Sequence, residues 1–388
     1  MPRIILVFAS TETATANVAG LPSIARAARE ADLAAQQFTN CCDIILAVSG
    51  RSFLDSWSLE EIARLVPGVE NCPTLTADLV PAPGDLWLAG ELLTPAETIL
   101  NCLRLNREGP NRLSCVSEPD RIQCFHAKQG PTGLATLLDA AGRDIVRATI
   151  KSSDGIVSRH FNRPISTRIT RLLLPYRAVR PIHATAAAAL IALAMFYCLI
   201  SGSYAGLMAG AILFHIASVI DGVDGEIARA TFRTSKMGAT LDSLTDAITN
   251  LAFLTGLGLG LTYQGAENAA LTGMIGFACL STGLVLLGGV AAFSGRPINF
   301  DALKCVVRQS RTQAANWIVW LTMRDFLALT GALMVVFGFG QRFLQLFAIG
   351  SCLWLIAVVA LVTVDSASAR TPMQRQLRSR GRAHRSGH

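Results

Sequence analysis

The sequence predicts two parts of different fold class, a soluble α/β domain followed by an all-α bundle of six transmembrane helices. Residues 1–150 mix polar and apolar residues in alternating strand-like and helix-like segments, the pattern of an α/β layer domain. Residues 182–364 are mostly apolar, and neither 182–220 nor 247–266 contains an Asp, Glu, Lys or Arg. Apolar runs of this length are typical of membrane-spanning helices.

The N-terminal domain is expected over residues 1–150. Residues 3–8 and 43–48 are short apolar runs that predict buried strands, and residues 21–36 between them have helical periodicity. Further helices are expected at 93–105 and 134–146. The ten Cys of the chain show no zinc-type spacing, so we expect reduced, structural thiols.

A basic linker is expected at residues 151–181. Six Arg occur here without an acidic residue between them: Arg159, Arg163, Arg168, Arg171, Arg177 and Arg180. Four apolar residues recur at helical spacing and form one face: Phe161, Ile165, Ile169 and Leu172. This pattern predicts an amphipathic helix at a membrane surface, either as a simple anchor or as a helix whose Arg also bind an anionic ligand.

The bundle domain is expected over residues 182–365. The predicted spans are 182–202, 204–224, 236–263, 268–294, 320–340 and 343–364. Basic residues concentrate in the loops of one side, in the linker and in the tail at 366–388, which we expect to be disordered at lipid head groups. By the positive-inside rule, both termini face the cytoplasm of a prokaryotic inner membrane.

Four aspartates occur in the stretch 221–246, between the two charge-free segments, where charges are costly. On a helix, Asp221 and Asp224 lie about 60° apart, while Gly238, Asp242 and Asp246 recur every fourth residue on the next helix. An antiparallel pair of helices would bring the four carboxylates together. Hard divalent ions such as Mg²⁺, Mn²⁺ or Ca²⁺ would offset their repulsion.

Small and basic residues accompany the carboxylates. Gly225 and Gly238 leave room for a bulky ligand, and Arg229 places a fixed positive charge one turn after Gly225. Divalent ions, an Arg and an open slot suit the diphosphate of a nucleoside.

The spacing Asp221-x2-Asp224-Gly225-x2-Ala228-Arg229-x8-Gly238-x3-Asp242-x3-Asp246 resembles the signature of the CDP-alcohol phosphotransferases in every fixed position. The resemblance implies two divalent cations, Mg²⁺ or Mn²⁺, held by Asp221, Asp224, Asp242 and Asp246. It implies a CDP-alcohol site formed by Asp221, Gly225, Ala228, Arg229 and Gly238. It also implies that Asp246 is the general base and that the protein is a homodimer. The acceptor candidates are Arg168 of the linker and the pair Arg324 and Asp325, which could instead be a local ion pair.

The linker KSSDGIVSRHFNRPISTRIT (151–170) is similar to that of bifunctional inositol-phosphate cytidylyltransferase/di-inositol-phosphate phosphate synthases. Residues 20–34 loosely resemble the first helix of sugar-nucleotide-type nucleotidyltransferases, but ASTETATANVAG (9–20) replaces the Gly-rich phosphate loop. We therefore expect a degenerate, non-catalytic N-terminal domain, the alternatives being a binding module or a cryptic activity. If the domain is only accessory, it is dispensable for transfer.

The expected activity is transfer of a phosphatidyl or phospho-alcohol group from a CDP-alcohol, such as CDP-diacylglycerol, to a hydroxyl with release of CMP. The acceptor is a polyol or inositol phosphate, and the product is either a phospholipid or a soluble solute. Membrane lipids are expected partners, and nucleic acid is not. The alternatives are a divalent-cation transporter, which the clustering of the acids beside Arg229 disfavours, and a non-catalytic membrane scaffold.

Overall fold

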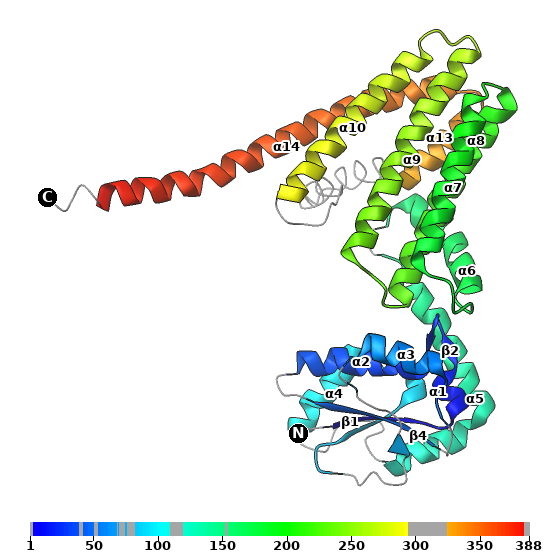
Figure 1. Cartoon of the computed structure of the whole chain (residues 1–388), viewed down its shortest axis with the longest axis vertical. Coiled ribbons are helices and arrows are strands. Elements are labelled where there is room, and N and C mark those ends of the chain that lie inside the picture. The colour runs from blue at the N-terminus through cyan, green and yellow to red at the C-terminus, as the bar shows by residue number, and fades with distance from the viewer. Residues whose placement is uncertain are drawn as a thin grey trace. The chain divides into compact units, whose positions relative to one another are not determined.

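The computed structural model describes residues 3–38, 42–49, 53–67, 69, 74–75, 82–108, 119–151, 154–293 and 324–383 (Figure 1). Contacts divide the chain into two compact units. The first, called here the N-terminal unit, comprises Met1–Lys151, Thr167–Val179 and Glu226–Arg233. The second, the membrane unit, comprises Ser152–Ser166, Arg180–Gly225 and Thr234–His388.

The N-terminal unit contains a four-stranded parallel sheet with the order β5-β4-β1-β6. Strands β1 (Arg3–Phe8) and β4 (Asp43–Val48) confirm the two predicted strands. They pair in parallel, with β5 (Thr74–Leu75) at one edge and β6 (Leu86–Ala89) at the other. A short antiparallel pair, β2 (Asn17–Val18) and β3 (Leu21–Pro22), follows the first helix, α1 (Thr11–Thr15). The α/β class predicted for this region is therefore confirmed.

Both faces of the sheet are buried, as expected for parallel strands. Alternate residues of β1 enter different hydrophobic clusters, Ile4, Leu6 and Phe8 on one side and Ile5 and Val7 on the other. The first cluster includes residues of α1, α2 (Ser23–Gln37), α3 (Ser56–Leu65) and α4 (Ala96–Glu108), together with Leu138 of the long helix α5 (Pro119–Ala148). The second cluster includes a residue of α5, which bends at Gly130 next to Pro131. The strands are thus covered on both sides by helices.

The linker forms a π-helical turn, η3 (Ser158–Asn162), that continues into α6 (Arg163–Leu173). The predicted apolar face is largely open: the exposed fractions are 54% for Phe161, 47% for Ile165 and 72% for Leu172. Apolar side chains left this exposed, next to Arg residues, fit a helix at a lipid surface.

Within the described residues, five helices are long and apolar enough to cross a membrane. They are α7 (Pro181–Ile200), α8 (Tyr204–Ala230), α9 (Lys236–Tyr263), α10 (Ala269–Phe293) and the first half of α14 (Gly340–Ala383). The remaining predicted span, 320–340, begins outside the described residues, and its described part is the shorter apolar helix α13 (Arg324–Val336). The basic loop at 294–311 also lies outside them. The structure shows α14 as helix to Ala383, through most of the tail for which the sequence predicts disorder.

Aromatic stacking and close helix packing hold the membrane unit together. Phe214 of α8 stacks on Phe253 of α9 with ring centroids 3.9 Å apart, and Phe343 of α14 meets Phe253 edge-on. Gly260 of α9 packs so tightly on α7 that a Cβ there would lie 2.2 Å from the Leu199 carbonyl oxygen. Small residues allow this approach in a membrane, where dispersion between helices replaces the hydrophobic effect.

The packing of α10 on α14 can be tested by oxidation. Cys279 and Cys352 have their Sγ atoms 3.3 Å apart. Treatment of the detergent-solubilised protein with copper phenanthroline should therefore give an intramolecular Cys279–Cys352 link, detected by mass spectrometry of a non-reducing digest. Cys279→Ser is the control and removes the linked peptide. Failure of the wild-type protein to form the link would contradict this pairing of helices.

Candidate metal centre and donor site

Three carboxylates of the membrane unit converge. Asp221 of α8 and Asp242 and Asp246 of α9 each offer an oxygen, and these oxygens lie within 4.8 Å of one another. All three residues are half-buried. The structure thus brings together three of the four carboxylates for which the sequence predicts a shared metal site.

The fourth carboxylate, Asp224, is buried one turn further along α8, with 6% of its surface exposed. Its Oδ2 accepts a hydrogen bond of 2.6 Å from the Thr185 hydroxyl of α7. Sequence reasoning missed Thr185, because a lone Thr in an apolar span gives no signal before its neighbour in space is known.

The residue types and the spacing suit a hard divalent cation. Two unit charges about 4 Å apart repel by about 4 kcal/mol at an effective dielectric constant near 20, so three clustered carboxylates need a compensating charge. Oxygen-only ligands favour Mg²⁺, Mn²⁺ or Ca²⁺. The residues present therefore fit such an ion.

Local capping places the Asp242–Asp246 stripe. Ser235 is the N-cap of α9, and its hydroxyl accepts from the Gly238 amide at 2.9 Å. The helix starts there, so Gly238, Asp242 and Asp246 follow at intervals of four on one face. Gly238 itself is exposed, which leaves its surface open to a ligand.

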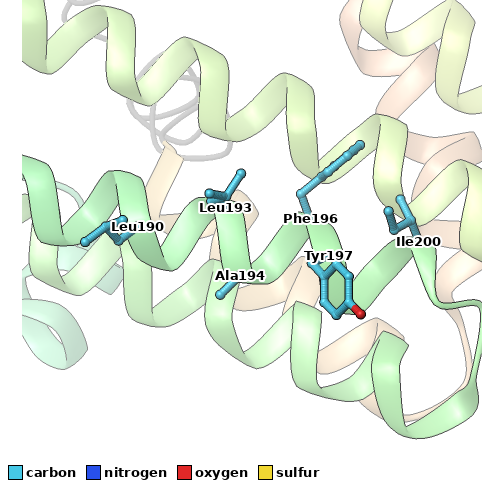
Figure 2. A pocket seen from close by; sticks show the side chains of 6 residues that line it. All are labelled: Leu190, Leu193, Ala194, Phe196, Tyr197 and Ile200. Carbon is cyan, nitrogen blue, oxygen red and sulfur yellow. The ribbon is translucent and has the colours of Figure 1, made fainter.

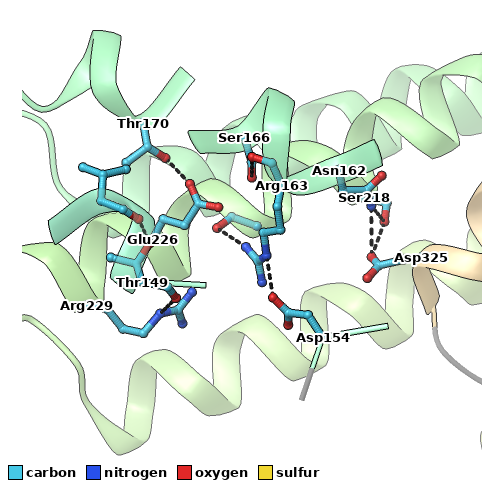
Figure 3. Close-up of polar contacts among 12 residues, drawn as sticks. Thr149, Asp154, Asn162, Arg163, Ser166, Thr170, Ser218, Glu226, Arg229 and Asp325 are labelled. Atoms are coloured by element: carbon cyan, nitrogen blue, oxygen red, sulfur yellow. Dashed lines mark hydrogen bonds and ion pairs between the residues drawn. The ribbon is translucent and has the colours of Figure 1, made fainter. Parts of the chain in front are cut away.

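Arg229 lies in the last turn of α8, where a cation is favoured by the helix dipole. Its Nε donates to the Thr149 carbonyl oxygen at 2.8 Å, next to the end of α5 (Figure 3). Gly225 and Ala228, which precede it, are half-buried. The bond to Thr149 orients the guanidinium, an arrangement that spacing alone did not predict.

Ser218, Gly222 and Glu226 recur every fourth residue along another face of α8 and are called here the polar seam. Figure 3 shows Ser218 and Glu226 of this seam with their partners. Arg163 is paired with Asp154 at 2.7 Å and also donates to the Gly222 carbonyl at 3.3 Å. A Cβ at position 222 would lie 2.9 Å from the Arg163 Nη1, so glycine is what admits the guanidinium.

Further along the seam, buried Glu226 accepts from the Thr170 hydroxyl at 2.6 Å. Arg163 of the linker is itself buried, with 8% of its surface exposed, whereas the sequence predicts a surface helix whose Arg reach lipid head groups or an anionic ligand.

The three acceptor candidates differ in their surroundings. Asp325, near the start of α13, accepts from Ser218 at 3.0 Å and from Asn162 at 3.2 Å (Figure 3). Arg168 is exposed on α6, and the side chain of Arg324 lies outside what the structure describes. Asp325 is therefore part of a polar cluster with the linker and α8, and its role toward an acceptor stays a prediction.

An apolar pocket lies on the surface of α7 (Figure 2). It is lined by Leu190, Leu193, Ala194, Phe196, Tyr197 and Ile200. Leu190, Leu193 and Tyr197 are each at least 66% exposed. Exposed apolar side chains on a long apolar helix are what a lipid-facing surface requires.

The crevice at the carboxyl ends of β1 and β6 is where ligands bind in open parallel sheets, because the chain order reverses there. In this chain, Glu91 fills that position with 1% of its surface exposed. Its carboxylate accepts from the Ala9 amide at 2.7 Å, the Thr13 hydroxyl at 2.8 Å and the His126 ring at 2.9 Å. The hydrogen-bond donors that follow β1, the Ala9 amide and the Thr13 hydroxyl, are thus bonded to the Glu91 carboxylate of the same chain.

Burial alone would raise the pKa of Glu91, but the hydrogen bonds from His126, Ala9 and Thr13 outweigh it and hold that pKa below its ordinary value. A carboxyl with a lower pKa in the folded state contributes stability above its unfolded pKa of about 4.3. That contribution is lost as the pH falls through the folded-state pKa.

Comparison with known proteins finds a family match for the membrane half of the chain. Residues 179–366 match the family model described as CDP-alcohol phosphatidyltransferase. Three curated relatives, each named "Bifunctional IPC transferase and DIPP synthase", share partial similarity. The protein of Thermococcus kodakarensis is 41% identical over 116 residues, 29% of this chain and 25% of the relative. That of Aquifex aeolicus is 40% identical over 125 residues, 32% and 28% of the two chains. That of Archaeoglobus fulgidus is 40% identical over 119 residues, 29% and 22%. The matched region thus spans about a quarter of the length of these relatives.

The three hydrogen bonds to the buried Glu91 carboxylate predict that the effect of Glu91→Gln on stability depends on pH. At pH 7 the variant should lower the local opening free energy of β1 by about 1–3 kcal/mol, because the amide replaces an ionised acceptor of three hydrogen bonds. The difference from wild type should shrink below about pH 4, where the wild-type carboxyl also becomes protonated. Hydrogen exchange of the Arg3–Phe8 amides in the full chain measures it, with exposed Glu60→Gln as the control. An equal effect at pH 7 and below pH 4 would refute the assignment.

Proposed function

We propose that this chain, whose residues 179–366 belong to the CDP-alcohol phosphatidyltransferase family, moves a substituted phosphate from a CDP-linked alcohol to an acceptor hydroxyl and releases CMP. The observation that carries the proposal is the convergence of Asp221, Asp242 and Asp246 on one point within 4.8 Å. A cluster of carboxylates on apolar helices supports a bound cation, and the family match supports the reaction.

The metal ligands proposed are Asp221, Asp224, Asp242 and Asp246, holding two divalent cations, Mg²⁺ or Mn²⁺. When bound, the ions would neutralise the carboxylates and the diphosphate of the donor. The hydroxyl of Thr185 holds the Asp224 carboxylate by its 2.6 Å hydrogen bond, which sets the orientation of that ligand.

The remaining signature residues bind the donor and assist the attack. Gly225, Ala228 and exposed Gly238 leave room for the cytidine, and Arg229 steadies the diphosphate through charge-assisted hydrogen bonds. Asp246 accepts the proton of the acceptor hydroxyl. At the same time the oxygen of that hydroxyl forms a bond to the phosphorus that carries the alcohol. The bond from that phosphorus to the CMP oxygen breaks, and CMP departs with the electron pair.

CDP-diacylglycerol is the donor we propose, because the catalytic helices are apolar enough to lie in a lipid bilayer. The acceptor proposed is a polyol or inositol phosphate, with Arg168, Arg324 and Asp325 at its site. The relatives named as DIPP synthases support a phosphorylated acceptor, and the basic residues of the linker suit one.

The setting proposed is the inner membrane of a prokaryote, with both termini and the carboxylate cluster on the cytoplasmic side and two copies forming a homodimer. The N-terminal domain is proposed to be a degenerate nucleotidyltransferase-like domain. The Glu91 carboxylate supports this, because it takes the hydrogen-bond donors that an anionic nucleotide would need. The CDP-alcohol would then be made by another protein.

Asp242→Asn tests the metal site. We expect CMP release from CDP-diacylglycerol to fall at least about a hundredfold, because a carboxylate that compensates charge at the reacting phosphate is lost. Titration of the protein with Mn²⁺, followed by electron paramagnetic resonance, should show weaker binding in parallel. Exposed Asp144→Asn is the control and should leave both unchanged. Undiminished turnover of the Asp242 variant would remove the assignment.

A panel of acceptors identifies the substrate. Purified protein, Mg²⁺ and labelled CDP-diacylglycerol should yield a labelled phospholipid with a polyol or inositol phosphate and none without an acceptor. Mass spectrometry of the lipid product names the acceptor. Uptake of Mn²⁺ into vesicles that contain the protein, without CMP release from any donor, would favour a cation transporter and overturn the proposal.

A further inference from the structure

We propose that Arg26 and Arg64 are positioning residues for the donor site, acting through the last turn of α8. This inference rests on the proposed function for its catalytic consequence, since that turn carries Arg229. Its structural part concerns contacts within the N-terminal unit alone, because the Glu226–Arg233 segment belongs to that unit.

The end of α8 closes with a turn that a glycine would normally make. The Arg233 amide donates to the Ala228 carbonyl at 2.8 Å, and the Phe232 amide donates to the Arg229 carbonyl at 3.4 Å. This is the Schellman pattern, in which the residue at C′ is left-handed and usually glycine. Here it is Phe232, with φ 51°. A bulky side chain in this conformation is strained and persists only where its surroundings hold it.

Arg26 of α2 supplies the first part of that support. It is buried, with 3% of its surface exposed, and its Nη2 donates to the Ala230 carbonyl at 2.6 Å. The same guanidinium donates to the Val18 and Ala19 carbonyls, each at 3.1 Å, and stands 5.4 Å from the centroid of the Phe232 ring. Burial lowers the pKa of Arg26 to about 10, so the group remains charged at neutral pH and retains its cation–π contact.

Arg64 of α3 supplies the second part. Its Nη2 donates to the Thr231 carbonyl at 2.9 Å and its Nη1 to the Phe232 carbonyl at 3.3 Å. Glu61 orients it through a 2.7 Å ion pair and also pairs with Arg233. Two arginines from different helices therefore bond three successive carbonyls, those of Ala230, Thr231 and Phe232, that the helix end leaves without partners.

The segment bonded by Arg26 and Arg64 contains Arg229, a residue of the proposed donor site. Residues 226–233 lie in the chain between Asp221–Asp224 and Asp242–Asp246, and they include Arg229, whose Nε is bonded to the Thr149 carbonyl. The bonds from Arg26 and Arg64, the Glu61–Arg233 pair and the bond to Thr149 all join this segment to residues 1–151. A domain that has lost its own phosphate loop would thus serve to hold Arg229 and the turn after it. On this proposal residues 1–150 contribute to transfer, which differs from the expectation drawn from the sequence.

The experiment uses the full chain in detergent and compares Arg64→Ala, Arg26→Ala and Arg147→Ala. Arg64 has a side chain 32% exposed, so its truncation leaves no sealed cavity. Arg147 is the matched control, an exposed Arg of the same domain that pairs only locally with Asp144. Hydrogen exchange of peptides covering 226–233 should quicken at least about tenfold in the first two variants and stay unchanged in the control, with β1 amides protected throughout.

A second substitution, at the strained residue Phe232, tests whether protection from exchange can be restored. Phe232→Gly in the Arg64→Ala background should restore protection, since glycine adopts the left-handed turn without support. Unchanged exchange of residues 226–233 in Arg64→Ala and Arg26→Ala would overturn the clamp, whether or not the wild type releases CMP.

The kinetic arm tests positioning. Arg64→Ala should raise the KM for CDP-diacylglycerol about tenfold, with a smaller effect on kcat, because Arg229 binds the donor's diphosphate. Faster exchange with wild-type KM and kcat would overturn the positioning role. Absence of CMP release in the wild type would instead count against the proposed function, and the exchange data would still decide the clamp.

Discussion

Repulsion among carboxylates is the constraint on which the arrangement of the membrane unit depends. Asp221, Asp242 and Asp246 lie within 4.8 Å of one another on helices that are otherwise apolar. Three negative charges this close together repel one another, and a divalent cation would offset that repulsion. The helices that carry it are in turn held by tight contacts, such as Gly260 against Leu199 and Phe214 on Phe253. Rigid packing of this kind keeps the ligand oxygens at the separation that a divalent ion needs.

Helix α8 serves three purposes on different faces. One face presents Asp221 toward the stripe of α9, and a second, the polar seam, takes hydrogen bonds from Arg163 and Thr170. Its last turn is capped by Arg26 and Arg64. Buried polar groups on a spanning helix must each find a partner, and here residues that precede the bundle in sequence supply them. The family signature is therefore embedded in contacts that the signature itself does not contain.

The N-terminal sheet has a buried carboxylate at the carboxyl ends of its strands β1 and β6. This carboxylate, that of Glu91, accepts hydrogen bonds from the Ala9 amide and the Thr13 hydroxyl. The hydrogen bond from His126 helps to hold the pKa of Glu91 below its ordinary value, so Glu91 is an anion at neutral pH. Helices of the same α/β unit also bond the last turn of α8 through Arg26 and Arg64.

The sequence by itself determined the division into an α/β domain and apolar spans, since hydrophobic periodicity and the absence of charge depend only on local order. It also determined the stripe of Gly238, Asp242 and Asp246 and the amphipathic face of the linker, because helical spacing alone aligns these residues. Only the tertiary structure decided that Asp224 bonds Thr185, that Arg163 is buried against Gly222, that Glu91 fills the crevice and that Phe232 is left-handed. Each of these depends on residues from 39 to 82 positions apart or on a strained backbone held by such residues, and no local pattern in a single chain encodes them.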